Sequence, residues 1–420
     1  MAEIKLLEEV RQIDEFIWPN YENGSIANVP ATVAALLGVP FAGLPPLRDE
    51  LWRPLAGGVK RVVVLIVDAM GWNLLQSERR NGNLEGMLGE TAVYSKITSI
   101  FPSTTAAVLS SYWTGSAPAQ HSLIGLNLFF PEHATAAQML KFTPVFGKYP
   151  DALIDAGTEP ENFLQTAGFG EQLHQSGIPT YSFKGHEIVD SVLSKMHGRG
   201  VEHNIGVQTV ADMMSRIRQV LEENPGKPMV INGYWPTIDM LSHVYTWQGD
   251  SVRAELRAIF AQLKCELLDS LSKAAAKDTV LFVVADHGQA LTPPSQHIEL
   301  DDHPLLKQML FMRPIGEPRV AYLYAKHGQQ QNILAYINQY LSHAMVAVNA
   351  EDALASGLFG PQPFAANIKD RIGDVVVITR KGYVLLSSKE MKKADILIGR
   401  HGSMTRAEME VPWLGFRLDR

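Results

Sequence analysis

Residues 62–67 form an unbroken apolar run, Val-Val-Val-Leu-Ile-Val, and residues 229–231 and 281–284 form two similar runs. Runs that are apolar at every position are typical of strands buried on both faces of a sheet. Amphipathic helical patterns lie between the runs, at residues 210–221 and 256–271. Strands that alternate with long helices indicate βαβ units. The expected fold class is therefore α/β, a three-layer α/β/α sandwich around a mostly parallel central sheet.

The pattern changes between about residue 305 and residue 395. Residues 320–324 alternate loosely between apolar and polar, residues 333–341 have a helical pattern, and residues 345–348 resemble a strand. We interpret 305–395 as a smaller inserted α+β subdomain, and 1–304 together with 396–420 as the main catalytic domain. Residues 131–165 mix Pro, Gly, Thr and acidic residues without periodicity, which favours a long loop at one edge of the sheet.

Composition excludes several classes of protein. The chain has 420 residues, of which 46% are hydrophobic and 19% charged, as in ordinary globular proteins. A formal net charge of −7 lacks the basic footprint of a nucleic-acid binder. The single cysteine, Cys265, can form neither an internal disulfide nor a Cys-based zinc site.

The N-terminus and the hydropathy pattern indicate the compartment in which the protein is expected. Acidic residues interrupt residues 1–9 early, so we expect no signal peptide there. No apolar stretch has the length needed to span a bilayer. We therefore expect a cytoplasmic protein with no membrane segment and no nucleic-acid-binding module, and leave the oligomeric state open.

Two acidic motifs directly follow apolar runs. Asp68 follows the run at 62–67, and Asp286-His287-Gly288 comes just after the run at 281–284. A carboxylate buried at the end of a strand is costly unless a cation pairs with it, and such strand ends are where ligands bind in parallel sheets. The alternative for Asp68 is a helix N-cap. Gly288 would permit a sharp turn or a close approach of two backbone segments.

Three further motifs carry polar side chains. Ser103, Thr104 and Thr105 precede an apolar helical pattern, and hydroxyls at a helix N-terminus suit an incoming phosphate, although N-capping explains them equally well. Asp239 and His243 are four residues apart, which places both on one face of a helix, as two ligands of one cation require. A surface pair is the alternative. His401 lies between Arg400 and Gly402 in a loop-like segment and is a weak signal alone.

Together these motifs supply three aspartates, three histidines and one hydroxyl. Carboxylate and imidazole are the ligands of a zinc or mixed divalent site. Seven ligands are too many for one tetrahedral ion and suit two. We therefore predict two divalent metal ions, with Zn²⁺ as the expected metal.

The order and spacing of the motifs resemble the type I phosphodiesterase/nucleotide pyrophosphatase family of the alkaline phosphatase superfamily. The resemblance rests on Asp68, Phe101-Pro102 before Thr105, Thr114-Gly115 nine residues later, Asp239 with His243, Asp286-His287-Gly288 and His401-Gly402. It spans residues 60–415. It implies an alkaline phosphatase-like fold, one metal held by Asp68, Thr105, Asp286 and His287, and a second held by Asp239, His243 and His401.

The resemblance also implies that Thr105 is the nucleophile and that an asparagine binds the phosphate. The nearest candidate is Asn127, one position beyond the expected offset. Residues 106–109 read Ala-Ala-Val-Leu, where the family commonly has Phe-Pro-Asn-His after the nucleophile.

These features predict a metal-dependent hydrolase of phosphodiester or pyrophosphate bonds in nucleotide-like substrates, acting through a phospho-threonine intermediate on small-molecule phosphate esters. A phosphomonoesterase or phosphonoacetate-type hydrolase with the same two-metal site is the alternative. Such a monoesterase needs an extra cation, for which Lys184, Arg199 and Arg406 are candidates. A metal-stabilised binding protein without activity is the non-enzymatic alternative.

Overall fold

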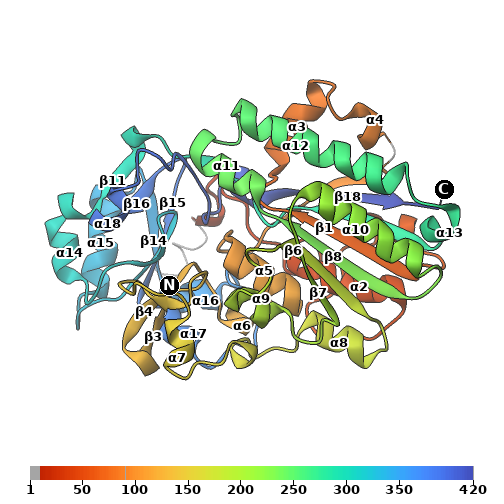
Figure 1. Cartoon of the computed structure of the whole chain (residues 1–420). Coiled ribbons are helices and arrows are strands. Elements are labelled where there is room, and N and C mark those ends of the chain that lie inside the picture. Colours follow the sequence, from red (N-terminus) through yellow and green to blue (C-terminus); the bar gives the residue numbers. More distant parts are fainter. Residues whose placement is uncertain (1–9, 90, 420) are drawn as a thin grey trace.

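The computed structural model describes residues 10–89 and 91–419. The expectation about a leader concerns residues 1–9, outside the described residues. Two seven-stranded sheets lie side by side (Figure 1). The sheet with the longer strands, at the right, is called the larger sheet, and the sheet at the left is called the smaller sheet. None of the described helices is both long enough and apolar enough to cross a membrane.

The larger sheet is mostly parallel, as predicted. Its strand order is β2-β18-β9-β1-β8-β6-β7. Strands β1, β8, β9, β6 and β7 pair in parallel, whereas β18 is antiparallel to both of its neighbours. The three apolar runs fall in its three adjacent central strands, β9, β1 and β8. The bounds are β1 (Arg61–Val67), β2 (Val93–Thr98), β6 (Thr180–Gly185), β7 (His203–Val207), β8 (Met229–Trp235), β9 (Thr279–Val284) and β18 (Glu410–Arg417).

Helices cover both faces of this sheet and complete the three-layer α/β/α fold (Figure 1). One face carries α3 (Trp72–Arg80), α10 (Val210–Glu223) and α12 (Asp250–Leu263). The other carries α2 (Val29–Leu37), α5 (Thr105–Thr114), α8 (Phe169–Gln175) and α9 (Val192–His197). Every residue of β1 and β9 is buried, which explains why these strands are apolar at each position after the first.

The smaller sheet is antiparallel throughout, in the order β14-β15-β13-β12-β3-β4-β5. Four strands come from residues 305–395: β12 (Ile315–Glu317), β13 (Val320–Leu323), β14 (Met345–Asn349) and β15 (Val375–Thr379). Its helices include α14 (Pro304–Met309), α15 (Gln330–Tyr340), α16 (Ala350–Ala355), α17 (Ile368–Ile372) and α18 (Ser388–Met391).

Residues 127–144 complete this sheet with β3 (Asn127–Phe130), β4 (Thr135–Gln138) and β5 (Thr143–Pro144). The segment that we interpreted as a loop, 131–165, therefore contains two short strands and a helical turn, α7 (Ala152–Asp155). A division between 305–395 and the rest of the chain stays a proposal, and β3–β5 would belong to the smaller unit structurally.

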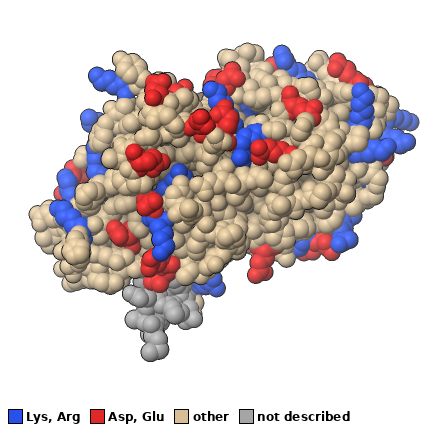
Figure 2. Space-filling model, turned by 90° about the horizontal axis from the view of Figure 1, so that it is seen from below, with Lys and Arg blue, Asp and Glu red and all other residues tan. Residues whose placement is uncertain are grey.

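Two short strands connect the sheets near the candidate site. β10 (Ala290–Leu291) pairs with β17 (Gly399–Arg400), which places residue 401 next to the turn that follows β9. A buried ion pair between Arg319 and Glu408 joins the smaller sheet to α19 (Arg406–Met409). On the face of the molecule that Figure 2 shows, seen from below relative to Figure 1, acidic and basic side chains are interspersed.

Candidate active site

Two carboxylates extend from the ends of neighbouring strands. Asp68 directly follows β1 and is 2% exposed, and Asp286 lies two residues beyond β9 and is fully buried. Asp286 Oδ1 accepts hydrogen bonds from the backbone N–H of Ala69 at 3.0 Å and of His287 at 2.8 Å. Gly288 fits the expected close approach, because a Cβ there would lie 2.1 Å from the carbonyl oxygen of Ala407.

Thr105 is the first residue of α5, and its side chain faces the metal-ligand candidates. Its Oγ1 lies 3.1 Å from His287 Nε2. The two neighbouring hydroxyls are engaged elsewhere: Ser103 donates to the carbonyl of Ser403 at 2.7 Å, and Thr104 bonds to the carboxyl group of Glu317. Of the three hydroxyls in this turn, that of Thr105 is therefore the one beside the buried aspartates.

The helix after β8, α11 (Thr237–Tyr245), supplies a second group. Asp239 Oδ2 lies 3.3 Å from His243 Nε2, and Asp239 Oδ1 lies 3.7 Å from His401 Nε2. The segment after β17 carries His401 to this helix, and the ring of His401 stacks on that of His287 at 3.8 Å between centroids. Residues far apart in the chain thus meet at the carboxyl edge of the larger sheet.

All three imidazoles have the same orientation toward the site. Nδ1 donates to a backbone carbonyl in each: His243 to Gly399 at 2.7 Å, His287 to Gly288 at 3.1 Å, and His401 to Ser103 at 3.0 Å. Because Nδ1 carries the proton, the Nε2 lone pairs are directed at the aspartates. Donation of the other ring N–H to a backbone carbonyl is characteristic of metal-ligating histidines.

Burial and mutual repulsion shape the electrostatics. Burial, with the charges of Asp286 and Asp239, raises the pKa of Asp68 well above its usual value, and burial raises the pKa of Asp286 to about 6. Burial lowers the pKa of His287 to about 4 and that of His401 to about 3. Burial alone would raise the pKa of Asp239, but the neighbouring imidazoles of His243, His401 and His287 lower it. A cation would relieve this crowding of carboxylates.

The donor set fits divalent metal ions. Two groups of three side chains have ligand atoms within 4.8 Å of one another: Asp239, His243 and His401, and Asp68, Asp239 and His287. Within the described chain, Asp68 Oδ1 and Asp286 Oδ2 are buried oxygens without a hydrogen-bond partner. Buried carboxylate oxygens of this kind call for a cation. Asp239 belongs to both groups, whereas the sequence assigned it to one.

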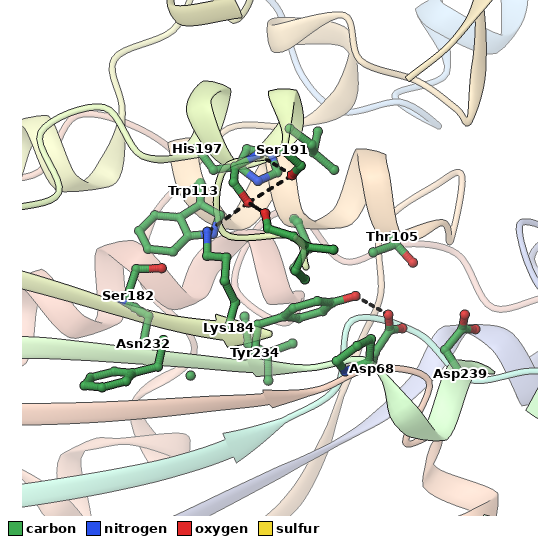
Figure 3. Close-up of a pocket in the computed structure, with 18 of the residues that line it drawn as sticks. Asp68, Thr105, Trp113, Ser182, Lys184, Ser191, His197, Asn232, Tyr234 and Asp239 are labelled. Carbon is green, nitrogen blue, oxygen red and sulfur yellow. Dashed lines mark hydrogen bonds between the residues drawn. The ribbon is translucent and has the colours of Figure 1, made fainter. Parts of the chain in front are cut away.

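A cavity of about 360 Å³ extends from these residues. Asp68, Thr105 and Asp239 line one end, and Lys184 and His197 line the other (Figure 3). The walls between them are largely apolar and include Ile66, Leu109, Trp113, Phe183 and Ile188. Lys184 is 5% exposed, lies over the ring of Trp113 at 5.9 Å, and donates to Ser194 Oγ at 3.2 Å.

Other sequence-predicted residues lie outside this arrangement. Asn127 starts β3, donates to the carbonyl of Gly316 at 2.9 Å, and lines a different cavity. Of the three candidate cations, only Lys184 lines the cavity with Thr105. Arg199 donates to the carbonyls of Leu164 and Thr166, and Arg406 pairs with Glu410 at 2.5 Å.

Three residues near the site were not among the site residues predicted from the sequence. The hydroxyl of Tyr234 donates to Asp68, and Gln289 Nε2 donates to Asp239 Oδ1 at 2.6 Å. Glu317 of β12 accepts from the N–H of Leu126 at 3.1 Å, and burial raises its pKa to about 7. Only the position of Tyr234 at the end of a buried strand, and of Gln289 after the Asp286 motif, could have singled them out.

Comparison with known proteins places this site in a family. The family model for type I phosphodiesterase/nucleotide pyrophosphatase matches residues 62–404. Among solved structures, an inactive variant of murine ectonucleotide pyrophosphatase/phosphodiesterase 5 in complex with AMP is 16% identical, with 86% of this chain and 90% of that chain covered and a TM-score of 0.62. Phosphonoacetate hydrolase from Sinorhizobium meliloti 1021 in complex with phosphonoformate is 19% identical, with 84% and 89% covered and a TM-score of 0.63. No curated protein sequence matches.

The fold and the family match define the class of protein. The architecture, an α/β fold with a mostly parallel sheet, matches that of the alkaline phosphatase-like structural neighbours. The chain belongs to the type I phosphodiesterase/nucleotide pyrophosphatase family, which is metal-dependent, and it is a hydrolase of that type. The predicted family and fold class are therefore confirmed.

Proposed function

We propose that this protein hydrolyses phosphodiester or pyrophosphate bonds of small molecules at the site formed by Asp68, Thr105, Asp239, His243, Asp286, His287 and His401. The observation that carries the proposal is the Thr105 hydroxyl, 3.1 Å from His287 Nε2 and beside unpartnered buried carboxylate oxygens. The structure of the inactive murine relative carries a threonine-to-alanine change, which agrees with a threonine nucleophile.

Asp68, Asp286 and His287 with Thr105 would hold one divalent ion, and Asp239, His243 and His401 the other, with Asp239 close enough to contact both. Two bound divalent ions, expected to be Zn²⁺, would supply Lewis-acid polarisation and neutralise charge in the transition state. Thr105 Oγ1 attacks phosphorus in line and displaces the leaving group, forming a phospho-threonine ester. Water then hydrolyses this ester and regenerates Thr105. Two in-line steps predict net retention of configuration at phosphorus.

The cavity supports a substrate with a second substituent. Its apolar walls would hold the part of a diester that is not displaced, and Trp113 offers a ring against which a flat group could pack. Lys184 at the far end would pair with an anionic group on that substituent. Asn127 has no role in this arrangement unless it moves from β3.

Lys184 also favours a second candidate, the phosphonoacetate-type or monoester hydrolase. Such substrates carry an additional negative charge that a buried lysine in the same cavity could neutralise. The phosphonate complexes of the Sinorhizobium relative are consistent with this reading. Of the three candidate cations that the sequence offers for such substrates, Lys184 is the one that lines the cavity.

The deciding experiment compares bis(4-nitrophenyl) phosphate, 4-nitrophenyl phosphate and phosphonoacetate on metal-loaded protein at fixed pH. We expect kcat/KM for the diester to exceed that for the monoester by about 10-fold or more. The apolar walls accommodate the second nitrophenyl group. Greater efficiency on the monoester or phosphonoacetate would establish the second candidate. No turnover of any ester or phosphonate by metal-loaded protein would contradict both.

A further inference from the structure

A second cavity, of about 500 Å³, lies between the smaller sheet and the segment around α18. Its lining comes from β3 and β4, from the residues before β12, and from residues 387–400. Within the described residues, it shares no lining residue with the cavity that contains Thr105. It is therefore separate from the active site proposed above.

Arg400 of β17 lines this cavity and is only 8% exposed. In the described part of the chain, neither its Nε nor its Nη2 has a hydrogen-bond partner. Burial lowers its pKa, and the negative charge of Glu390 partly opposes this shift. Buried guanidinium donors are ordinarily satisfied, so two donors without a partner on a side chain that lines a cavity indicate a missing acceptor.

Three further cations surround the cavity. Arg313, Lys389 and Lys393 are exposed and line it, against one acidic residue, Glu390. The Glu390 carboxylate is already engaged, because it accepts from the N–H and hydroxyl of Ser387 at 2.8 and 2.7 Å. The whole chain has a formal net charge of −7, so this local cluster of positive charge is a distinct feature of the cavity. Such a cluster attracts anions.

The remaining lining is apolar or weakly polar. The ring of Phe146 lies under the guanidinium of Arg313 at 4.6 Å, and Leu126, Val145, Ile315 and Leu397 contribute aliphatic surface. A ligand that matches this cavity has an anionic head for Arg400 and an apolar or flat body for the walls. The planar fork of Arg400 suits an oxyanion that accepts two parallel hydrogen bonds.

We propose that this cavity binds a small organic molecule whose oxyanion head, a phosphoryl or carboxylate group, is held by Arg400 and whose body lies against the apolar walls. Arg400 immediately follows Gly399, whose carbonyl accepts from His243, and precedes His401. A molecule bound here contacts the strand that supports two of the proposed metal ligands without entering the cavity of Thr105. The site does not depend on the reaction proposed above.

The test uses the full, metal-loaded chain and two probes with the same ring, phenylphosphonate and benzoate. Titration calorimetry measures affinity, and hydrogen–deuterium exchange locates each probe. We expect protection in residues 387–400, with phenylphosphonate bound more tightly because a dianion meets more of the cations at the rim. Arg400→Gln should weaken this binding about 10-fold or more. Lys393→Gln should weaken it severalfold.

Lys392→Gln is the matched control, because Lys392 is exposed beside Lys393 and does not line the cavity. Because Arg400→Gln could disturb folding, the comparison of Lys393→Gln and Arg313→Gln with Lys392→Gln decides the outcome independently. The probe that binds more tightly identifies the preferred head group, a phosphoryl group or a carboxylate. Protection confined to residues 180–197 and the Thr105 region would overturn the proposal. Equal affinity in the Lys393, Arg313 and Lys392 variants would do the same.

Discussion

At the scale of single residues, the proposed chemistry depends on which hydroxyl of the turn at 103–105 is free to react. Thr105→Ala is expected to lower kcat by about 1,000-fold or more while leaving the fold and most metal binding intact, because only one ligand atom is lost. Steady-state kinetics measure the first effect, and circular dichroism with metal analysis measures the second.

Thr104→Ala is the matched control for this prediction. Thr104 bonds to Glu317 rather than facing His287, so its loss should cost far less activity. An inactive Thr104→Ala protein beside an active Thr105→Ala protein would show that Thr105 is not the nucleophile.

Lys184 should make folding stability depend on alkaline pH. Burial lowers its pKa to about 8 in the folded protein, against about 10.4 in an unfolded chain. Between these values the unfolded state binds more protons, so the free energy of unfolding rises with pH from about 8 to 10.4. Below pH 8 the full cost of burying the charged Lys184 side chain, about 3 kcal/mol, lowers the free energy of unfolding. Lys184→Met should remove most of this cost at pH 7 and flatten the slope.

Urea unfolding from pH 7 to pH 10.5 measures this effect. Lys195→Met on α9 serves as the control, because Lys195 is exposed. If the two variants and the parent protein had the same pH slope, Lys184 would not be buried as a cation.

The sequence identified the buried aspartates and histidines because such residues rarely follow buried strands without a ligand. Asp68 and Asp286 stood out for this reason. It named Lys184 only as one of three candidate cations, since a lysine in a strand usually reaches solvent and only the folding of α9 over β6 encloses it. Asn127 illustrates the opposite case: its side chain donates to the carbonyl of Gly316 and lines a cavity other than that of Thr105.

At the scale of elements, the ion pair of Arg319 and Glu408 ties the smaller sheet to the active-site loops. Glu408 accepts from Arg319 Nε at 2.9 Å and Nη2 at 2.6 Å, and from the N–H of Ser403 at 3.0 Å. Its carbonyl accepts from the N–H of Gly288 at 2.8 Å. One carboxylate and its backbone thus hold the loop that carries His401 and the turn after β9.

Arg319→Met is expected to lower the free energy of unfolding by about 3–5 kcal/mol, because it leaves a buried carboxylate without its cation. Adding Glu408→Gln should restore part of the loss, since the unpaired charge disappears. Lys369→Met is the control: its partner Glu351 is 75% exposed, and such pairs contribute about 1 kcal/mol or less. Chemical denaturation distinguishes these outcomes, and equal costs for Arg319→Met and Lys369→Met would contradict the argument.

The larger elements were predictable because strands buried on both faces form long apolar runs, as β1 and β9 do after their first residue. The smaller sheet was only partly predictable. Strands β4 and β5 are four and two residues long, which is too short for either to produce a periodic pattern. The pairing of β4 with β3, and of β3 with β12 almost 190 residues later in the chain, is a tertiary property.

At the scale of the whole molecule, five separate segments meet at one edge of the larger sheet: the ends of β1 and β9, the start of α5, α11 and the segment after β17. Motif order allowed the set of residues to be predicted, because parallel strands place their carboxyl ends together. The order of the motifs alone did not determine which of these residues would bind which of the two ions. The position of Asp239, within reach of His401 on one side and Asp68 on the other, makes it a candidate to contact both ions.

Two divalent ions per chain, about 4 Å apart, are therefore expected. Removing them with a chelator should lower the melting temperature, because Asp68 and Asp286 are then left buried without a cation. His401→Ala should retain about one ion, whereas Asp239→Asn should weaken both, since Asp239 belongs to both ligand groups. His303→Ala is the control, because His303 bonds to Tyr336 and belongs to neither group. Elemental analysis gives the ion count and anomalous diffraction the separation. One ion bound in the parent protein, or equal loss from the His303 and His401 variants, would refute the two-metal assignment.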